Sequence, residues 1–128
     1  MQYLVDTNAW ITFFEDSPRL SNHAAELMES ASAECFVSIA SVWEAAIKVG
    51  LGKLELPYDL EQDLPCIFDE NGFSLLGIEF SDAVRVRDLP RMHGDPFDRL
   101  MVSQAKERRW PVISSDPVFD LYGVRRIW

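Results

Sequence analysis

Four acidic side chains stand where they could act together in catalysis: Asp6, Glu44, Asp98 and Asp116. Carboxylates that crowd together repel one another and take up protons unless a cation holds them. A set of oxygen ligands without cysteine or histidine suits Mg²⁺ or Mn²⁺ better than zinc. Such a metal site can activate a water molecule and hold a phosphate that is to be cleaved. The four acids therefore indicate hydrolysis of a phosphodiester.

Each acid also has a purely structural interpretation. Asp6 precedes Thr7-Asn8 and could start a turn, as could Asp116 before Pro117. The pattern from Ser41 to Glu44 fits a capping box, and Asp98 lies in the first turn of a predicted helix, where an acid suits the helix dipole. Taken singly, each structural interpretation is favoured. Four such acids at one edge of a sheet favour a metal site instead.

The elements that must position these acids alternate along the chain. Apolar runs predict strands over residues 3–5, 34–37, 73–78, 111–114 and 124–127. Helices are predicted over residues 8–14, 22–32, from Ser38 or Ser41 to about 49, 59–70, 82–88 and 96–109, where Asp95 before Pro96 is a strong start signal. This alternation predicts an α/β fold with a mainly parallel sheet. Without a repeat or linker in the sequence, we expect one domain over residues 1–128.

In a parallel sheet, the first and fourth strands end at the same edge, so Asp6 and Asp116 should emerge there. Glu44 lies early in the helix after the second strand, and Asp98 begins the helix that precedes the fourth. All four should meet at this carboxyl edge, which is where open α/β sheets bind ligands.

Composition narrows the class of protein. The net charge of −9 argues against a protein that coats nucleic acid non-specifically. Residues 1–84 contain three basic and fifteen acidic residues, a net charge of −12, whereas residues 85–128 contain nine basic and six acidic ones, a net of +3. We therefore expect a polyanionic ligand to approach the C-terminal part, or a site where a metal ion masks the acids. Without a visible signal peptide or bilayer-length apolar run, and with Cys35 and Cys66 predicted as buried reduced thiols, we expect a cytoplasmic protein.

Several segments resemble those of PIN-domain ribonucleases of the VapC toxin type, and they occur in the family's order over nearly the whole chain. The segments are Val5-Asp6-Thr7-Asn8, Ser41-Val42-Trp43-Glu44 with Lys48, Gly52-Lys53-Leu54-Glu55-Leu56, His93-Gly94-Asp95-Pro96-Phe97-Asp98-Arg99 and Ser114-Ser115-Asp116. The Asp-Pro-Phe-Asp-Arg segment is the most specific of them.

The resemblance implies a PIN-like three-layer sandwich with a five-stranded sheet, and the four acids as ligands of Mg²⁺ or Mn²⁺. It also implies an endoribonuclease toxin that cleaves RNA (tRNA or rRNA are possible substrates), forms a homodimer and is inhibited by a VapB-type antitoxin. Candidates for supporting roles are Asn8, Ser41, Asp95, Arg99 and Ser115. Asp95 is expected to cap its helix, Arg99 to pair with a carboxylate, and the Ser115 hydroxyl to serve where a threonine is also common.

Two alternatives belong to other classes. A signalling module resembling a response-regulator receiver domain would need an acceptor Asp after the middle strand and a Lys after the last one. Here the third strand ends in Leu76-Gly77-Ile78 and no lysine follows Arg109, which argues against it. A non-catalytic RNA-binding PIN domain is the other alternative, but all four acids are present.

Overall fold

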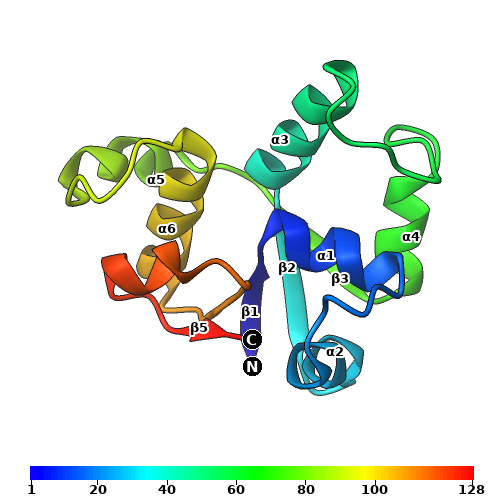
Figure 1. The fold of residues 1–128 in the computed structure, drawn as a ribbon. Helices are drawn as coiled ribbons and strands as arrows, with labels where there is room; N and C mark the ends of the chain where they lie inside the picture. Colours follow the sequence, from blue (N-terminus) through cyan, green and yellow to red (C-terminus); the bar gives the residue numbers. More distant parts are fainter.

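A five-stranded parallel sheet lies at the centre of the protein, with helices on both faces (Figure 1). The structure is a computed structural model that describes residues 1–128. The strands are β1 (Gln2–Val5), β2 (Glu34–Ser38), β3 (Phe73–Leu76), β4 (Val112–Ile113) and β5 (Arg126–Ile127). The helices are α1 (Thr7–Phe14), α2 (Asn22–Glu29), α3 (Ile39–Gly50), α4 (Leu64–Glu70), α5 (Phe80–Arg85) and α6 (Pro96–Arg108), with 3-10 helices η1 (Val86–Asp88) and η2 (Pro117–Tyr122).

The strand order β3-β2-β1-β4-β5 places the first strand in the middle of the sheet. The chain first builds outward from β1 through β2 to β3, and then continues on the other side of β1 with β4 and β5. The direction of winding therefore changes between β1 and β4. In open parallel sheets, the carboxyl ends of the strands at such a change leave a crevice for ligands. The predicted α/β class with a mainly parallel five-stranded sheet is confirmed.

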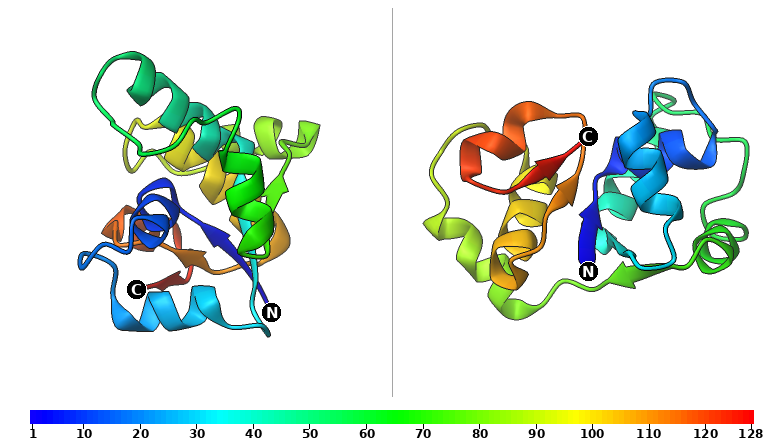
Figure 2. Two further views of the ribbon diagram at one scale, coloured as in Figure 1. Left: turned by 90° about the vertical axis from the view of Figure 1, so that its right-hand side faces the viewer. Right: turned by 90° about the horizontal axis from the view of Figure 1, so that it is seen from below.

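Alternating side chains divide the core into two layers, one on each face of the sheet. On one face, Tyr3 and Val5 of β1 pack with Trp10 of α1 and with residues of α2 and α4. On the other face, Leu4 of β1 packs against Met101 and the rest of the buried side of α6, together with η2. The two groups of helices lie on opposite sides of β1 when the molecule is seen from below (Figure 2, right). Because both faces are covered, β1 is apolar along most of its length.

Two predicted helix starts are wrong, each for a local reason. The helix expected from residue 59 begins at Leu64, because Asp59 instead accepts hydrogen bonds from the backbone N–H groups of Glu61 and Gln62 in a turn. Pro65 then stands in the first turn of α4, where a proline is tolerated. The helix expected from residue 82 begins at Phe80, because Glu79, rather than Ser81, forms a capping box with Asp82.

Two further differences concern single side chains. Ser38, and not Ser41, caps α3, since its hydroxyl accepts the N–H of Ala40. Cys35 is buried as expected, whereas Cys66 is exposed. None of the helices combines the length and the hydrophobicity that crossing a bilayer requires.

Candidate active site

Asp6 lies at the carboxyl end of β1 and is the most enclosed of the four predicted acids, with 7% of its surface exposed. Its Oδ1 accepts the backbone N–H of Thr7 at 2.8 Å, and its Oδ2 accepts the hydroxyl of Ser114 at 2.7 Å. Burial raises the pKa of Asp6 to about 7. The Ser114 hydrogen bond opposes this rise, and the nearby charges of Asp98 and Glu44 add to it. Near neutral pH the metal-free carboxyl group is therefore only partly ionised.

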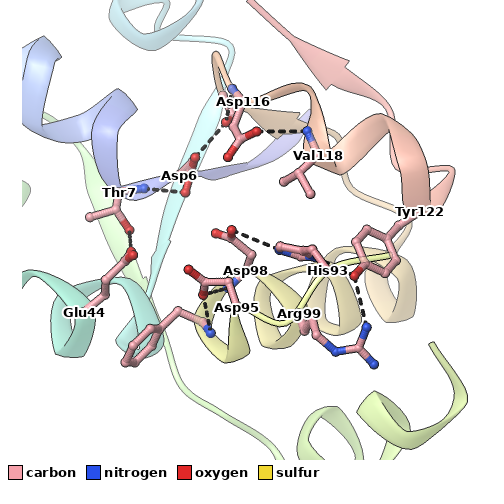
Figure 3. A network of polar contacts seen from close by, with 12 residues as sticks. Asp6, Thr7, Glu44, His93, Asp95, Asp98, Arg99, Asp116, Val118 and Tyr122 are labelled. Carbon is pink, nitrogen blue, oxygen red and sulfur yellow. Dashed lines mark hydrogen bonds and ion pairs between the residues drawn. The ribbon is translucent and has the colours of Figure 1, made fainter. Parts of the chain in front are cut away.

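Glu44 projects from α3 toward Asp6 and is 8% exposed. The Thr7 hydroxyl donates to Glu44 Oε1 at 2.6 Å (Figure 3). Lys48 Nζ lies 3.4 Å from Glu44 Oε2. Because Ser38 caps α3, Glu44 lies more than one turn inside the helix and makes no capping contact. The structural interpretation of Glu44 as the end of a capping box is therefore wrong.

Asp98 faces the same region from the first turn of α6 (Figure 3). The helix is capped by Asp95, whose Oδ1 accepts the N–H groups of Phe97 and Asp98 at 2.9 and 3.1 Å, as predicted. The Asp98 side chain is left free of capping and contacts His93, with 3.2 Å between Oδ2 and Nε2. Burial and then the Asp95 carboxylate raise the pKa of Asp98 to about 6, in opposition to the His93 hydrogen bond.

Asp116 follows β4 and is exposed. Its side chain accepts the N–H of Val118 at 3.0 Å and so caps η2, as its structural interpretation expected. It is also tied to Asp6: the Ser114 hydroxyl that donates to Asp6 accepts the backbone N–H of Asp116 at 3.0 Å. A single serine therefore fixes the spacing between the ends of the two strands at the point where the winding of the sheet changes.

The structure brings the four acids to one edge, but it holds them apart. Thr7 stands between Asp6 and Glu44, and Ser114 stands between Asp6 and Asp116. No three histidine, cysteine, aspartate or glutamate side chains approach closely enough to enclose a metal ion as they stand. Like charges without a cation keep such a distance. The donors are all carboxylate oxygens, which fits a hard cation such as Mg²⁺ or Mn²⁺, and does not fit zinc.

The five supporting candidates separate into two groups. Ser41 and Asp95 take part in hydrogen bonds at the site: Ser41 Oγ lies 2.6 Å from the Thr7 hydroxyl, and Asp95 caps α6. Asn8 and Ser115 are exposed on its rim, and neither side chain makes a hydrogen bond. Arg99 pairs with no carboxylate, contrary to expectation. Its guanidinium donates to the Tyr122 hydroxyl at 3.0 Å and to backbone carbonyls.

Three residues that orient the acids were not predicted: Thr7, Ser114 and Tyr122. Thr7 and Ser114 orient Glu44 and Asp6, while the Tyr122 hydroxyl lies 2.6 Å from His93 Nδ1 and so fixes the ring that contacts Asp98. The first two stand beside predicted acids in the sequence, which is the only signal that could have found them. Nothing in the sequence connects Tyr122 to Asp98.

A family match agrees with this fold and with the acids at the carboxyl edge of its sheet. Residues 3–124 match the PIN domain, and the chain belongs to that family. No curated protein matches the chain in sequence. Solved structures share the fold at low identity. VapBC2 from Rickettsia felis, bound to a DNA fragment from the promoter of the pair, has a TM-score of 0.73 and 12% identity over 99% of this chain and 98% of that one.

Two further solved structures are similar. DNA-bound VapBC from Salmonella typhimurium has a TM-score of 0.70 and 18% identity, covering 99% of this chain and 97% of the other. FitAcB from Neisseria gonorrhoeae has a TM-score of 0.63 and 18% identity, covering 98% and 96%. The predicted membership of the PIN domain family is confirmed, and the predicted fold is shared with these VapBC and FitAcB structures.

Proposed function

We propose that the protein is a metal-dependent endoribonuclease and the toxin of a toxin–antitoxin pair. The observation that carries the nuclease proposal is the group of Asp6, Glu44 and Asp98 at the carboxyl edge, close enough that the charges of Asp98 and Glu44 raise the pKa of Asp6 and that of Glu44 raises the pKa of Asp98. A fold gains nothing in stability by burying acids that repel one another, so such an arrangement is expected where a cation is to be bound. The membership of the PIN domain family supports the same function.

In this proposal Asp6, Glu44 and Asp98 would hold Mg²⁺ or Mn²⁺. The exposed Asp116 would lie on the solvent side of the site. The bound cation would polarise the scissile phosphate and lower the pKa of the attacking water. The surrounding residues keep the carboxylates in position: Ser114 orients Asp6, the Thr7 hydroxyl orients Glu44, and His93 orients Asp98. Hydrolysis adds the water oxygen to phosphorus and breaks one phosphorus–oxygen bond, and the departing oxygen takes up a proton.

Cleavage should depend on a divalent metal. We expect RNA cleavage in Mg²⁺ or Mn²⁺ and its loss in EDTA, because without the cation the carboxylates repel the phosphate. Purified protein would be incubated with a mixture of tRNA and rRNA, with excess Mg²⁺ added back after EDTA as the control. Undiminished cleavage in EDTA would contradict the metal mechanism.

The partners in this proposal are a second copy of the chain and a VapB-type antitoxin. The antitoxin is supported by the similarity to the solved structures of VapBC2, FitAcB and DNA-bound VapBC. A candidate surface for contacts is the row of exposed apolar side chains on α3, where Trp43 is 57% exposed and stacks edge-on against Phe97 of α6. An apolar antitoxin helix could cover this row, with a basic side chain near the carboxylates.

Light scattering on the purified chain should therefore give the mass of a dimer. Co-expression with the short reading frame beside its gene should yield a heavier complex that no longer cleaves RNA. The control is Trp43→Ser, which removes the largest exposed apolar side chain and should weaken the complex without lowering cleavage by the free protein. If the complex cleaves RNA as fast as the free chain, the partner does not inhibit the enzyme, and the proposal of an antitoxin is wrong.

A further inference from the structure

A pocket of about 420 Å³ lies beside the four acids, and residues that contact them or neighbour them in the chain line it. Thr7, whose hydroxyl and backbone N–H contact Glu44 and Asp6, forms part of its wall, as do Asn8 and Ser115 on the rim. Its volume is within the range of small-ligand sites, ~300–1,000 Å³, and is sufficient for about one nucleotide unit. A nucleotide attached to a phosphate bound at the acids would therefore lie beside this pocket.

The basic residues of the acidic half of the chain all converge on this pocket. Residues 1–84 contain only three, Arg19, Lys48 and Lys53, and each of them lines it. They come from three separate segments: the loop after α1, the last turn of α3 and the turn beyond it. The pocket also contains the carboxylates of Glu15 and Glu55. Three cations meeting at one place, in a stretch with a net charge of −12, indicate a site for an anion.

Two of these cations are not committed to other partners. Arg19 and Lys53 are exposed, and their side chains take part in no ion pair or hydrogen bond of the structure. The six ion pairs have as their basic members Lys48, Arg85, Arg87, His93, Arg108 and Arg126. Lys48 contacts Glu44 at 3.4 Å and so extends the positive charge to the edge of the acid cluster. The remaining wall includes the indole of Trp128, an aromatic face of the kind on which a base stacks.

The basic C-terminal part is less suited to binding RNA than its charge alone suggested. Arg108 makes two hydrogen bonds to the buried Asp82, at 2.8 and 3.0 Å, and Arg126 makes two to Asp120. Arg85 and Arg87 also pair with acids. Four of its nine basic residues are therefore held by neighbouring carboxylates, and its unpaired arginines, Arg91, Arg109 and Arg125, do not line the pocket beside the acids.

We propose that the pocket lined by Arg19, Lys48, Lys53 and Trp128 is the subsite that holds the nucleotide next to the scissile phosphate of a single-stranded RNA. The cations bind its phosphate, and the indole supports its base. This inference rests on the proposed nuclease function, because it assumes that the scissile phosphate lies at the acids while the neighbouring nucleotide lies in the pocket. It replaces the C-terminal basic segment as the main contact with the RNA backbone.

The test measures RNA binding as a function of salt in an Asp98→Asn background with Mg²⁺, so that the RNA stays intact. The probe is a short fluorescein-labelled single-stranded RNA of mixed sequence, and the readout is its anisotropy. The pocket variant is Arg19→Gln with Lys53→Gln. Its matched control is Arg91→Gln with Arg125→Gln, which removes two exposed and unpaired charges of the C-terminal part. Thermal melts establish that both variants are folded.

The pocket variant should bind more weakly, and the slope of log K against log salt should become shallower by about 1.4, since each single-strand phosphate contact contributes roughly 0.7. The control variant should keep the slope of the parent protein. Equal losses in the two variants, or a loss in the control alone, would overturn the subsite. So would unchanged RNA binding accompanied by loss of the antitoxin complex, which would assign the pocket to a protein partner. Cleavage of the probe by the Asp98→Asn parent would instead count against the proposed nuclease site itself.

Discussion

Asp98→Asn should abolish most RNA cleavage and leave the metal-free fold at least as stable. Asparagine keeps the shape of aspartate but removes one negative charge that raises the pKa of the nearby Asp6. Relief of that repulsion should stabilise the apo protein or leave it unchanged. Cleavage should fall by more than ~100-fold, because loss of an outer partner of a metal ligand already costs about 10–100-fold. Thermal melts in EDTA and initial rates in Mg²⁺ measure the two effects.

Asp95→Asn is the matched control for this substitution. It removes the same charge three residues away and keeps a good helix cap, since asparagine and aspartate cap equally well. Asp95 accepts both N–H groups of the cap, so the structure gives Asp98 no capping role to lose. If Asp98 were only an acid in the first helical turn, its substitution would lower stability by about 0.3–1 kcal/mol and spare activity. Lower stability together with unchanged cleavage would show that the role of Asp98 is only structural.

The metal-free protein should lose stability as the pH rises from about 4 to 7. The pKa of Asp6 is about 7 in the folded protein against an ordinary value of 3.8, so the unfolded chain releases this proton first. Ionisation then favours the unfolded state, and the full penalty is present above pH 7 and absent below pH 4. For Asp6 alone it amounts to about 4 kcal/mol, at 1.36 kcal/mol for each pH unit between the two values.

Denaturant unfolding in EDTA at several pH values measures this loss, and Asp6→Asn is the comparison because it cannot ionise. The difference in unfolding free energy between the two proteins should grow from pH 4 to 7 in favour of the variant. Added Mn²⁺ should reverse the trend for the wild type only, since the cation favours the charged form. Parallel pH profiles for the two proteins would show that burial of Asp6 carries no such cost.

The sequence predicts the backbone positions of the site better than its hydrogen bonds. Asp6 and Asp116 could be placed at one edge because each follows an apolar run, and strands of a parallel sheet end together. Asp95 could be identified as a cap from the proline after it. These inferences need only local patterns, which is why the structure agrees with them.

The hydroxyl partners could not be found in the same way. The position of Ser114 at Asp6 depends on the register of β1 with β4, and that of Tyr122 at His93 depends on how η2 packs on α6. The sequence favoured Ser115, but in the structure Ser114, directly after β4, donates to Asp6, and Ser115 is exposed. Similarly, Arg99 was expected to pair with a carboxylate, and only the tertiary fold reveals the Tyr122 hydroxyl as its partner.

The hydrogen bonds around Thr7 run in one direction, from the hydrophobic core outward. The indole N–H of the fully buried Trp10 can only donate, and it donates to Ser41 Oγ at 2.8 Å. Ser41 then has its proton free for Thr7, and Thr7 has its own for Glu44. The order of donors therefore makes Glu44 the final acceptor of a chain of hydrogen bonds that begins in the core. A core residue thus helps to orient the site: Trp10→Phe would remove the first donor and leave Ser41, and through it Thr7, less firmly held beside Glu44.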